Sequence, residues 1–263
     1  MLSREVRAVA GNLVEAMRFF GRGREDAEVR DCPGVSLISC GLNYAAFNSA
    51  VFSAPVPTES DDLVQRIQTS AAHFEGLGLR WTSWLCEDFL DPALRRQLRT
   101  TFQRFGLSLL IDPPGLYADA LLIPKRPLPT LQVRPVEDDS TRLAFAYITS
   151  VAFEIPLEIC KQIYGSERAW AGSFKGYIGY VDGVPVTTAA VVVTGEVAGI
   201  YSVGTLPNFR RKGHAEAIMR TALESVKQRT GIEASVLQST ASGLSLYGRM
   251  GYRKMTRFRV YIS

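Results

Sequence analysis

The chain has few of the residues that metal centres and histidine-dependent enzymes require. It contains two histidines, His73 and His214, which excludes a histidine-rich zinc site and any catalytic triad not built on one of these two. Its four cysteines form no C-x-x-C pair, so we expect them to be reduced and buried rather than metal ligands. These absences predict a protein without a bound metal.

Long apolar stretches and two common phosphate-binding motifs are also missing. No window approaches 18 uncharged apolar residues, so no transmembrane helix and no membrane association are expected. Charged residues interrupt the N-terminus, which argues against a signal peptide and for a cytoplasmic protein. Neither G-x-x-x-x-G-K-[ST] nor G-x-G-x-x-G occurs, which excludes a P-loop and a dinucleotide fingerprint.

The net charge of +4 is unevenly distributed along the 263 residues. Residues 130–263 hold 16 basic and 11 acidic side chains, a balance of +5, whereas residues 1–129 hold 14 and 15. A positive second half suits an anionic cofactor. No basic stripe with interleaved aromatic residues is present, so no nucleic-acid partner is expected.

A proline-rich segment divides the chain into two halves, 1–129 and 130–263. Residues 123–135 contain four prolines together with Lys125 and Arg126, which is typical of an exposed, semi-rigid linker. In the second half the patterns predict the element order β-α-α-β-β-β-α-β-α-β, with a hairpin turn at Asp182-Gly183. The fold class expected there is a mixed α/β sheet.

The most informative segment is a strand, a basic loop and a helix between residues 199 and 231. The apolar strand 199–203 leads into a loop with three consecutive cations and Gly213. Apolar residues then recur at helical spacing from Ala215 to Val226, and Gly231 is a suitable stop. Because the first amides of a helix lack partners and carry positive dipole charge, this arrangement predicts a site for a diphosphate.

Two motifs in the second half resemble signatures of the GCN5-related N-acetyltransferase (GNAT) superfamily. Arg210-x-x-Gly213-x-Ala215 resembles R/Q-x-x-G-x-G/A, the coenzyme A diphosphate loop. Residues 246–252, LYGRMGY, resemble the second signature, L-Y-x-x-x-G-F. The motifs occur in the family's order, with one helix and one strand between them. The resemblance implies an acyl-CoA N-acyltransferase fold over residues 130–263.

The resemblance also implies a cofactor and a set of site residues. Acetyl-CoA would be the cosubstrate, with no metal, and Tyr247 would protonate the departing thiolate. The Val203 amide would donate to the oxyanion. The residues expected to hold the cofactor are Val203, Thr205, Arg210, Arg211, Lys212, Gly213, His214, Ala215 and Ser242.

The general base is left open among several residues. Glu196, at the start of the motif strand, is one candidate, and Glu154 is another; Tyr201 or Ser202 could act through water. Ser239 and Ser242 precede the last helix and either cap it or contact the cofactor. The acceptor is expected to be a small-molecule amine or a peptide, and whether the chain forms a homodimer is also open.

The first half has a related rhythm, so we expect a second, degenerate GNAT-like domain and hence a tandem protein. Helices are expected at 6–20, 63–77 and 92–105, and strands at 35–40, 43–51 and 81–86. At the position of a phosphate loop it has no glycine and three acids, Glu59, Asp61 and Asp62, which repel a diphosphate. We therefore expect one coenzyme A site per chain.

Three hypotheses about function remain open. The first is an N-acetyltransferase in which a primary amine attacks the acetyl-CoA thioester directly. The second is a non-catalytic, regulatory protein that binds coenzyme A. The third is a scaffold whose first half recruits a partner.

Overall fold

The computed structural model describes residues 2–58 and 61–263, which form one mixed sheet with helices on its faces. The helices are α1 (Arg4–Met17), α2 (Asp62–Gly76), α3 (Pro92–Gln103), α4 (Asp139–Phe153), α5 (Leu157–Tyr164), α6 (His214–Thr230) and α7 (Leu244–Met250). The strands are β1 (Glu28–Cys32), β2 (Val35–Ser39), β3 (Ser49–Phe52), β4 (Thr82–Cys86), β5 (Ser108–Ile111), β6 (Pro114–Ala118), β7 (Gln132–Pro135), β8 (Phe174–Val181), β9 (Val184–Thr194), β10 (Val197–Thr205), β11 (Ser235–Gln238) and β12 (Arg253–Ile262).

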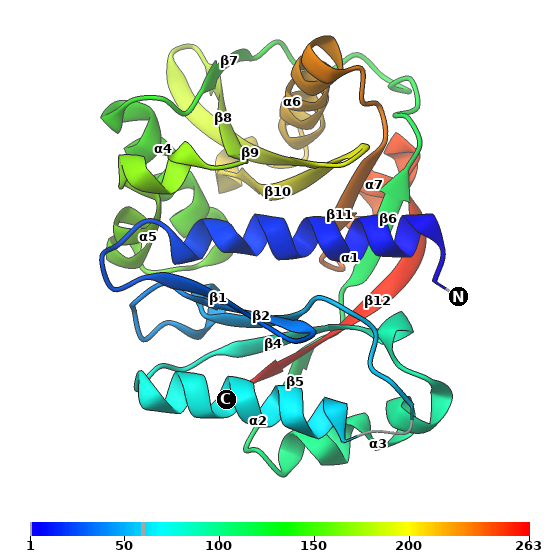
Figure 1. Ribbon diagram of the computed structural model, residues 1–263. Helices are drawn as coiled ribbons and strands as arrows, with labels where there is room; N and C mark the ends of the chain where they lie inside the picture. Colours follow the sequence, from blue (N-terminus) through cyan, green and yellow to red (C-terminus); the bar gives the residue numbers. More distant parts are fainter. Residues whose placement is uncertain (1, 59–60) are drawn as a thin grey trace.

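Two halves of the sheet are arranged one above the other (Figure 1). The strand order is β1-β2-β3-β4-β12-β6-β11-β10-β9-β8-β7, and β5 pairs with β12 beside this path. Most pairs are antiparallel, but β3 with β4 and β10 with β11 are parallel. The predicted mixed α/β sheet is confirmed.

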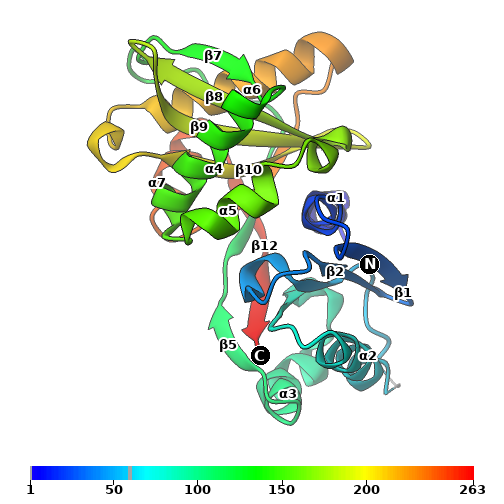
Figure 2. The ribbon, with the colours of Figure 1, turned by 90° about the vertical axis from the view of Figure 1, so that its left-hand side faces the viewer.

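The two halves exchange strands. The first part of β12, Arg253–Arg257, pairs with β6, which also pairs with β11, so a strand of the first half completes the sheet of the second. The last part of β12, Phe258–Ile262, lies between β4 and β5 and completes the sheet of the first half. Figure 2 shows β12 running from one half into the other. This exchange crosses the division predicted at residues 129 and 130 and was not anticipated from the sequence.

Helix α1 lies between the two parts of the sheet (Figure 1). Its apolar face contributes Val9 and Leu13 to a core that also contains Val197 and Val236 of the second half. Its Asn12 is fully buried and donates to the Val192 carbonyl (2.9 Å) and the Thr194 hydroxyl (2.7 Å). The first helix of the chain is therefore part of the second half's core.

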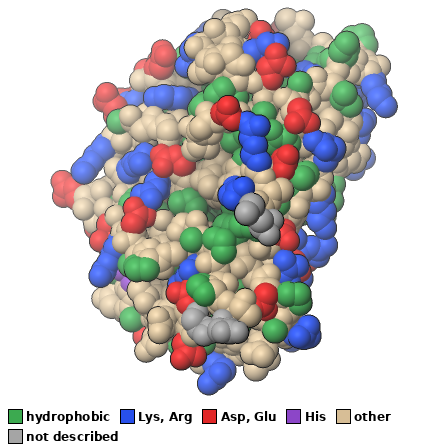
Figure 3. Space-filling model, turned by 45° about the vertical axis from the view of Figure 1, so that its right-hand side comes forward, with side chains coloured by type: hydrophobic (Ala, Val, Ile, Leu, Met, Phe, Trp, Pro, Cys, Tyr) green, Lys and Arg blue, Asp and Glu red, His purple; other side chains and the backbone are tan. Residues whose placement is uncertain are grey.

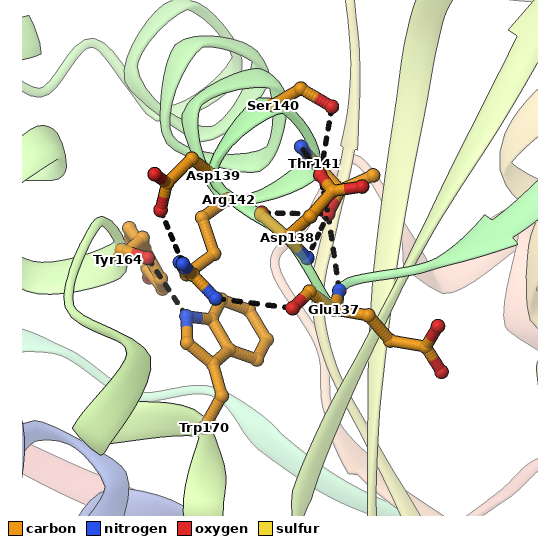
Figure 4. A network of polar contacts seen from close by, with 8 residues as sticks. All are labelled: Glu137, Asp138, Asp139, Ser140, Thr141, Arg142, Tyr164 and Trp170. Carbon is orange, nitrogen blue, oxygen red and sulfur yellow. Dashed lines mark hydrogen bonds and ion pairs between the residues drawn. The ribbon is translucent and has the colours of Figure 1, made fainter.

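In the second half, α6 covers one face of β8–β10, while α4, α5 and α1 cover the other (Figure 2). Helix α4 begins at a capping box, in which the Asp138 carboxylate accepts from the Thr141 amide and the Thr141 hydroxyl accepts from the Asp138 amide. The Thr141 amide, with the hydroxyls of Ser140 and Thr141, lowers the pKa of Asp138 to about 2. The Arg142 guanidinium binds Asp139 and the Glu137 carbonyl, and the Trp170 indole donates to the Tyr164 carbonyl, as Figure 4 shows. The start of α4 is thus tied to the chain before it.

The element predictions agree closely with the second half and less closely with the first. Asp182 and Gly183 both have positive φ, as the predicted hairpin turn requires, and Gly231 ends α6 with φ 74°. The strand predicted at 43–51 is wrong over its first part, where Ala45–Phe47 forms a 3₁₀ turn. The cause is the Asn48 side chain, which bonds backbone groups of Cys40, Leu42 and Arg80 in place of a strand partner.

Acidic and basic side chains are interspersed over the face shown in Figure 3. Among the residues that the structure describes, no helix has the length and apolar character needed to cross a bilayer.

Candidate active site

The sheet opens between β10 and β11. The two parallel strands pair only at Ala198 with Ser235 and at Gly199 with Val236. Beyond Gly199, the edge of β10 that faces β11 pairs with no other strand of the described residues. Unpaired backbone donors and acceptors therefore line this edge, and an extended amide-containing ligand could hydrogen-bond to them as an added strand does.

A β-bulge in β10 accompanies the opening. The register with β9 shifts between Tyr201 and Gly204, and Ser202 within the shift has φ 49°, a left-handed conformation rare for a residue other than glycine. The Thr188 hydroxyl donates to the Ser202 carbonyl at 2.9 Å and stabilises this conformation. The bulge contains Val203, whose amide is the expected oxyanion donor.

The basic loop follows β10 and leads into α6. Arg211 has φ 61° and Gly213 has φ 93°, so the chain turns sharply before the helix begins at His214. The first intrahelical bond runs from the Ala217 amide to the Gly213 carbonyl at 3.0 Å. The amides of residues 214–216 consequently have no helical acceptor, and the positive end of the helix dipole adds to their attraction for an anion.

The side chains of the loop leave its positive charge uncompensated. Arg210 donates to the Thr205 carbonyl at 3.0 Å, and the Lys212 ammonium lies 5.5 Å from the centre of the Phe209 ring. In the described parts of the chain, no acidic side chain forms an ion pair with Arg210, Arg211 or Lys212. The loop therefore combines free amides with free cations, and its residues fit a diphosphate.

His214 is more buried than the sequence suggested. It was expected to help hold the cofactor, but it is 6% exposed and its ring lies near that of Phe209. Burial and the charge of Lys212 lower its pKa, so the imidazole is neutral at physiological pH. Its Nδ1 is buried without a hydrogen-bond partner among the described atoms. His214 thus contributes its backbone amide to the loop, and its ring packs inside.

Tyr247 lies at the same edge of the sheet as the loop, because β10 and β11 are parallel and both end there. Its ring packs over Gly243, where a Cβ would come within 2.6 Å of the tyrosine ring, and close to Ser239. Tyr247 and Val203 both pack against one hydrophobic cluster around α6. Burial raises the pKa of Tyr247 to about 12, so its hydroxyl keeps its proton at neutral pH.

The two serines before α7 do not cap that helix. The N-cap residue is Gly243, with no side-chain hydrogen bond. Ser239 donates to the Thr240 carbonyl, and the Ser242 hydroxyl is 3.0 Å from that of Thr240. The capping role expected for them is therefore wrong, because the chain turns at 240–243 before the helix starts. Ser242 is exposed.

Glu196 lies away from this edge. It occupies the turn before β10, is 78% exposed and pairs with Arg4 of the first half. Ser202 is six residues further along β10, roughly 20 Å at the usual rise of a strand. The structure therefore does not bring Glu196 together with the loop and Tyr247, and the geometry gives its role as a base no support.

The other candidate bases differ in their availability. Tyr201 donates to the Asn12 side chain at 2.6 Å, and burial raises its pKa, so it is engaged and protonated. Burial raises the pKa of Tyr164, and the neighbouring Ser202 side chain partly offsets this effect. Glu154 has φ 57° at the end of α4, two residues after Ala152, whose Cβ lies 3.0 Å from the position of a Cβ on Gly204. Glu154 is exposed and follows this contact by two residues, so it stays a candidate base.

The corresponding region of the first half is closed. Strands β3 and β4 pair through Ser49, Ala50 and Val51, almost to the end of β3. The loop that follows directs carbonyl groups inward, where Arg66 binds those of Ala54 (2.6 Å) and Pro55 (3.0 Å).

This polarity is the opposite of that in a phosphate site. The buried Arg66 also pairs with Asp62, one of the three acids noted in the sequence, whereas Glu59 lies outside the described residues. The first half therefore presents carbonyl oxygens and a bound guanidinium where the second half presents free amides.

A separate cavity of about 400 Å³ lies near the C-terminal end of α6. Trp170, Tyr177 and Arg229 are among its lining residues. Arg229 is about 23 Å along α6 from the basic loop at the usual helical rise. Within residues 2–58 and 61–263, no group of three or more His, Cys, Asp or Glu side chains could hold a metal ion.

Asn12, the polar residue of the first half that supports β10, was not singled out from the sequence. Asn12 interrupts the apolar face of α1, between Ala10 and Leu13, and this interruption was the available signal. Only the structure shows that its side chain reaches β9 and Tyr201.

Comparison with known proteins identifies the class of the second half. Residues 182–255 match the family model of the acetyltransferase (GNAT) domain. The match spans the strands β9–β11, the basic loop, α6 and α7, so both motifs lie within it. The second half thus carries a GNAT domain, and the resemblance seen in the sequence is confirmed. A search of curated proteins found no match.

Solved structures extend the similarity to the whole chain. A GCN5-related N-acetyltransferase from Kribbella flavida is 20% identical, with a TM-score of 0.73 over 100% of this chain and 96% of that one. One from Sphaerobacter thermophilus is 17% identical, with a TM-score of 0.54 and the same coverage. A tandem GNAT protein from the clavulanic acid biosynthesis pathway is 12% identical, with a TM-score of 0.57 over 87% and 78%. These similarities establish a tandem GNAT fold.

Proposed function

We propose that the protein is an acetyl-CoA-dependent N-acetyltransferase that transfers the acetyl group to a primary amine by direct attack on the thioester. The observation that carries this proposal is the opening of the sheet between β10 and β11, with an uncompensated basic loop at its end. A GNAT domain over residues 182–255 supports it. The matched family is one of acetyltransferases, so acyl transfer is the activity expected of this opening.

The loop and the strand edge would hold the cosubstrate. The amides of residues 214–216 and the neighbouring cations would bind the diphosphate, while the unpaired edge of β10 would align the pantetheine arm. The Val203 amide, within the bulge, would donate to the oxyanion that forms when the amine attacks the carbonyl carbon. One such donor can contribute about 3 kcal/mol to transition-state stabilisation.

Two protons must move during the reaction. The attacking ammonium must lose a proton before the C–N bond forms, and we assign its acceptance to Glu154, directly or through water. As the C–S bond breaks, the thiolate of coenzyme A gains a proton, and we assign its donation to Tyr247. A thiolate with a pKa near 8.5 leaves readily, so the tyrosine accelerates the step without being indispensable.

The second candidate function is a regulatory protein that binds coenzyme A without catalysis. It would use the same loop and strand edge, so binding alone does not separate the two. Thiol release from acetyl-CoA, measured against a panel of amines, amino acids and peptides, does separate them. We expect amine-dependent release with one acceptor class; binding of coenzyme A without release for any acceptor would support the regulatory protein instead.

A further inference from the structure

The linker between the halves crosses the basic loop. A Cβ on Gly213 would lie 3.0 Å from Cδ of Pro129 and 3.8 Å from a terminal nitrogen of Arg126. These contacts join residues 84 and 87 positions apart in the sequence. The linker segment 126–129 therefore packs directly on the turn that opens α6, and the absence of a side chain at Gly213 makes this approach feasible.

The linker adds positive charge at this turn. Lys125 and Arg126 are exposed, and in the described residues neither forms an ion pair with an acidic side chain. Many other arginines of the chain do pair, including Arg220 with Glu216 one turn into α6. Unpaired cations that converge on one turn repel one another, and a bound polyanion would remove this repulsion.

We propose that Arg126 binds the diphosphate of the coenzyme A thioester together with the basic loop. This inference rests on the proposed function and extends the site to a residue outside both motifs. An arginine suits the role because its planar guanidinium can bind two phosphate oxygens at once, while the amides of residues 214–216 bind others. Its position against Gly213, directly before the free amides of α6, favours the diphosphate over the 3′-phosphate.

A mechanical consequence follows from this contact. The linker is the covalent connection between the halves, so a ligand bound by Arg126 and the loop would hold the linker against α6. Binding of coenzyme A should therefore order residues 125–129 as well as the loop. This consequence can be measured independently of acetyl transfer.

The first test is calorimetric titration of the full-length protein with coenzyme A. Arg126→Gln should raise the Kd roughly three- to tenfold, since the guanidinium–phosphate contact is exposed to solvent and salt. Arg126→Lys, which keeps the charge but not the fork, should lie between Arg126→Gln and wild type. The control is Arg104→Gln, which removes an exposed cation next to α3 in the other half and should leave the Kd unchanged.

Titration with a second ligand shows which phosphate group of coenzyme A Arg126 contacts. With 3′-dephospho-coenzyme A, Arg126→Gln should weaken binding by the same factor, because the diphosphate is retained. An effect seen only with coenzyme A would move the contact to the 3′-phosphate and overturn the assignment. If wild type binds but Arg126→Gln binds equally well, the inference alone is wrong. If wild type does not bind coenzyme A, the proposed function fails with it.

The second test is limited trypsin cleavage followed by mass spectrometry. Trypsin should cut after Lys125, since the next basic residue, Arg126, precedes proline. Saturating coenzyme A should slow release of the fragments 1–125 and 126–263 in wild type and not in Arg126→Gln at equal occupancy. Unchanged cleavage in wild type at saturation would show that the linker is not held by the ligand.

Discussion

The contact between Asn12 and Gly199 joins the first helix to the motif strand, and its disruption has a calculable cost. A Cβ on Gly199 would lie 1.7 Å from the Asn12 side-chain oxygen and 2.6 Å from the Tyr201 ring. Gly199→Ala must therefore displace the Asn12 carboxamide from its three partners at 2.6–2.9 Å. Asn12 is fully buried, so no water can replace these bonds without rearrangement.

The loss of unfolding free energy follows from the polar groups that each substitution leaves without hydrogen-bond partners. Asn12→Ala orphans the buried Tyr201 hydroxyl and removes one bond from the Val192 carbonyl, which should cost about 2–4 kcal/mol. Gly199→Ala loses the same bonds and also overpacks the site, for about 3–5 kcal/mol. In the double variant the alanine at 199 occupies the space vacated by the carboxamide. The pair should then cost about 3 kcal/mol rather than the sum, which is a large coupling energy.

The assay is urea unfolding of the two single variants, the double variant and Gly11→Ala. Gly11 lies next to Asn12 in α1, and a Cβ there would contact nothing within 4 Å. Gly11→Ala should be neutral or should stabilise the helix by about 0.5–1 kcal/mol. Additive costs for Asn12→Ala and Gly199→Ala would refute the reasoning, because independent sites would mean that the two groups do not compete for one space.

Three further predictions concern catalysis, strand exchange and the thiols. Tyr247→Phe should lower kcat more than cofactor affinity, and Glu154→Gln should lower kcat/KM at neutral pH, both measured by thiol release. Because the pKa of Tyr247 is about 12, ionisation of this tyrosine should cause no loss of the wild-type rate at pH values up to about 10. Tyr261→Ala removes a buried ring stacked 4.0 Å from Phe102 and should cost about 3–5 kcal/mol in urea unfolding, whereas a small loss would contradict a structural role for the end of β12. A thiol reagent should modify only Cys32, which is partly exposed, in the native protein and all four cysteines in denaturant. Burial raises the pKa of the other three thiols, those of Cys40, Cys86 and Cys160.

Local sequence patterns predicted the helices and turns of the second half well because neighbouring residues determine where these elements begin and end. Helix α6 needs a turn that exposes amides, and Gly213 before it and Gly231 after it mark both ends in the sequence. The same holds for the hairpin at Asp182-Gly183, whose residues tolerate positive φ. The residues that set these turns are close together in the sequence, so the turn before α6 and the helix that contains Tyr247 could be predicted.

The pairing of strands that are far apart in the sequence could not be predicted. Strand β6 begins with Pro114, and its place between β11 and β12 depends on residues more than 100 positions away. Glu196 was a plausible base because it lies at the start of the motif strand. The strand is extended, however, so its start is far from the bulge at Ser202. Helix α4 packs on Gly204 through Ala152, a contact that no spacing in the sequence encodes.

The first half contributes to the proposed site by three separate routes. Helix α1 supports β10 through Asn12, β6 pairs with β11 beside the opening, and the linker lies on Gly213. A scaffold that only recruits a partner would need none of these contacts. Residues 130–263 alone would also lack β6, leaving both β11 and β12 with an unpaired edge in place of a shared neighbour. The structure therefore favours a first half that supports the strands and the basic loop of the second.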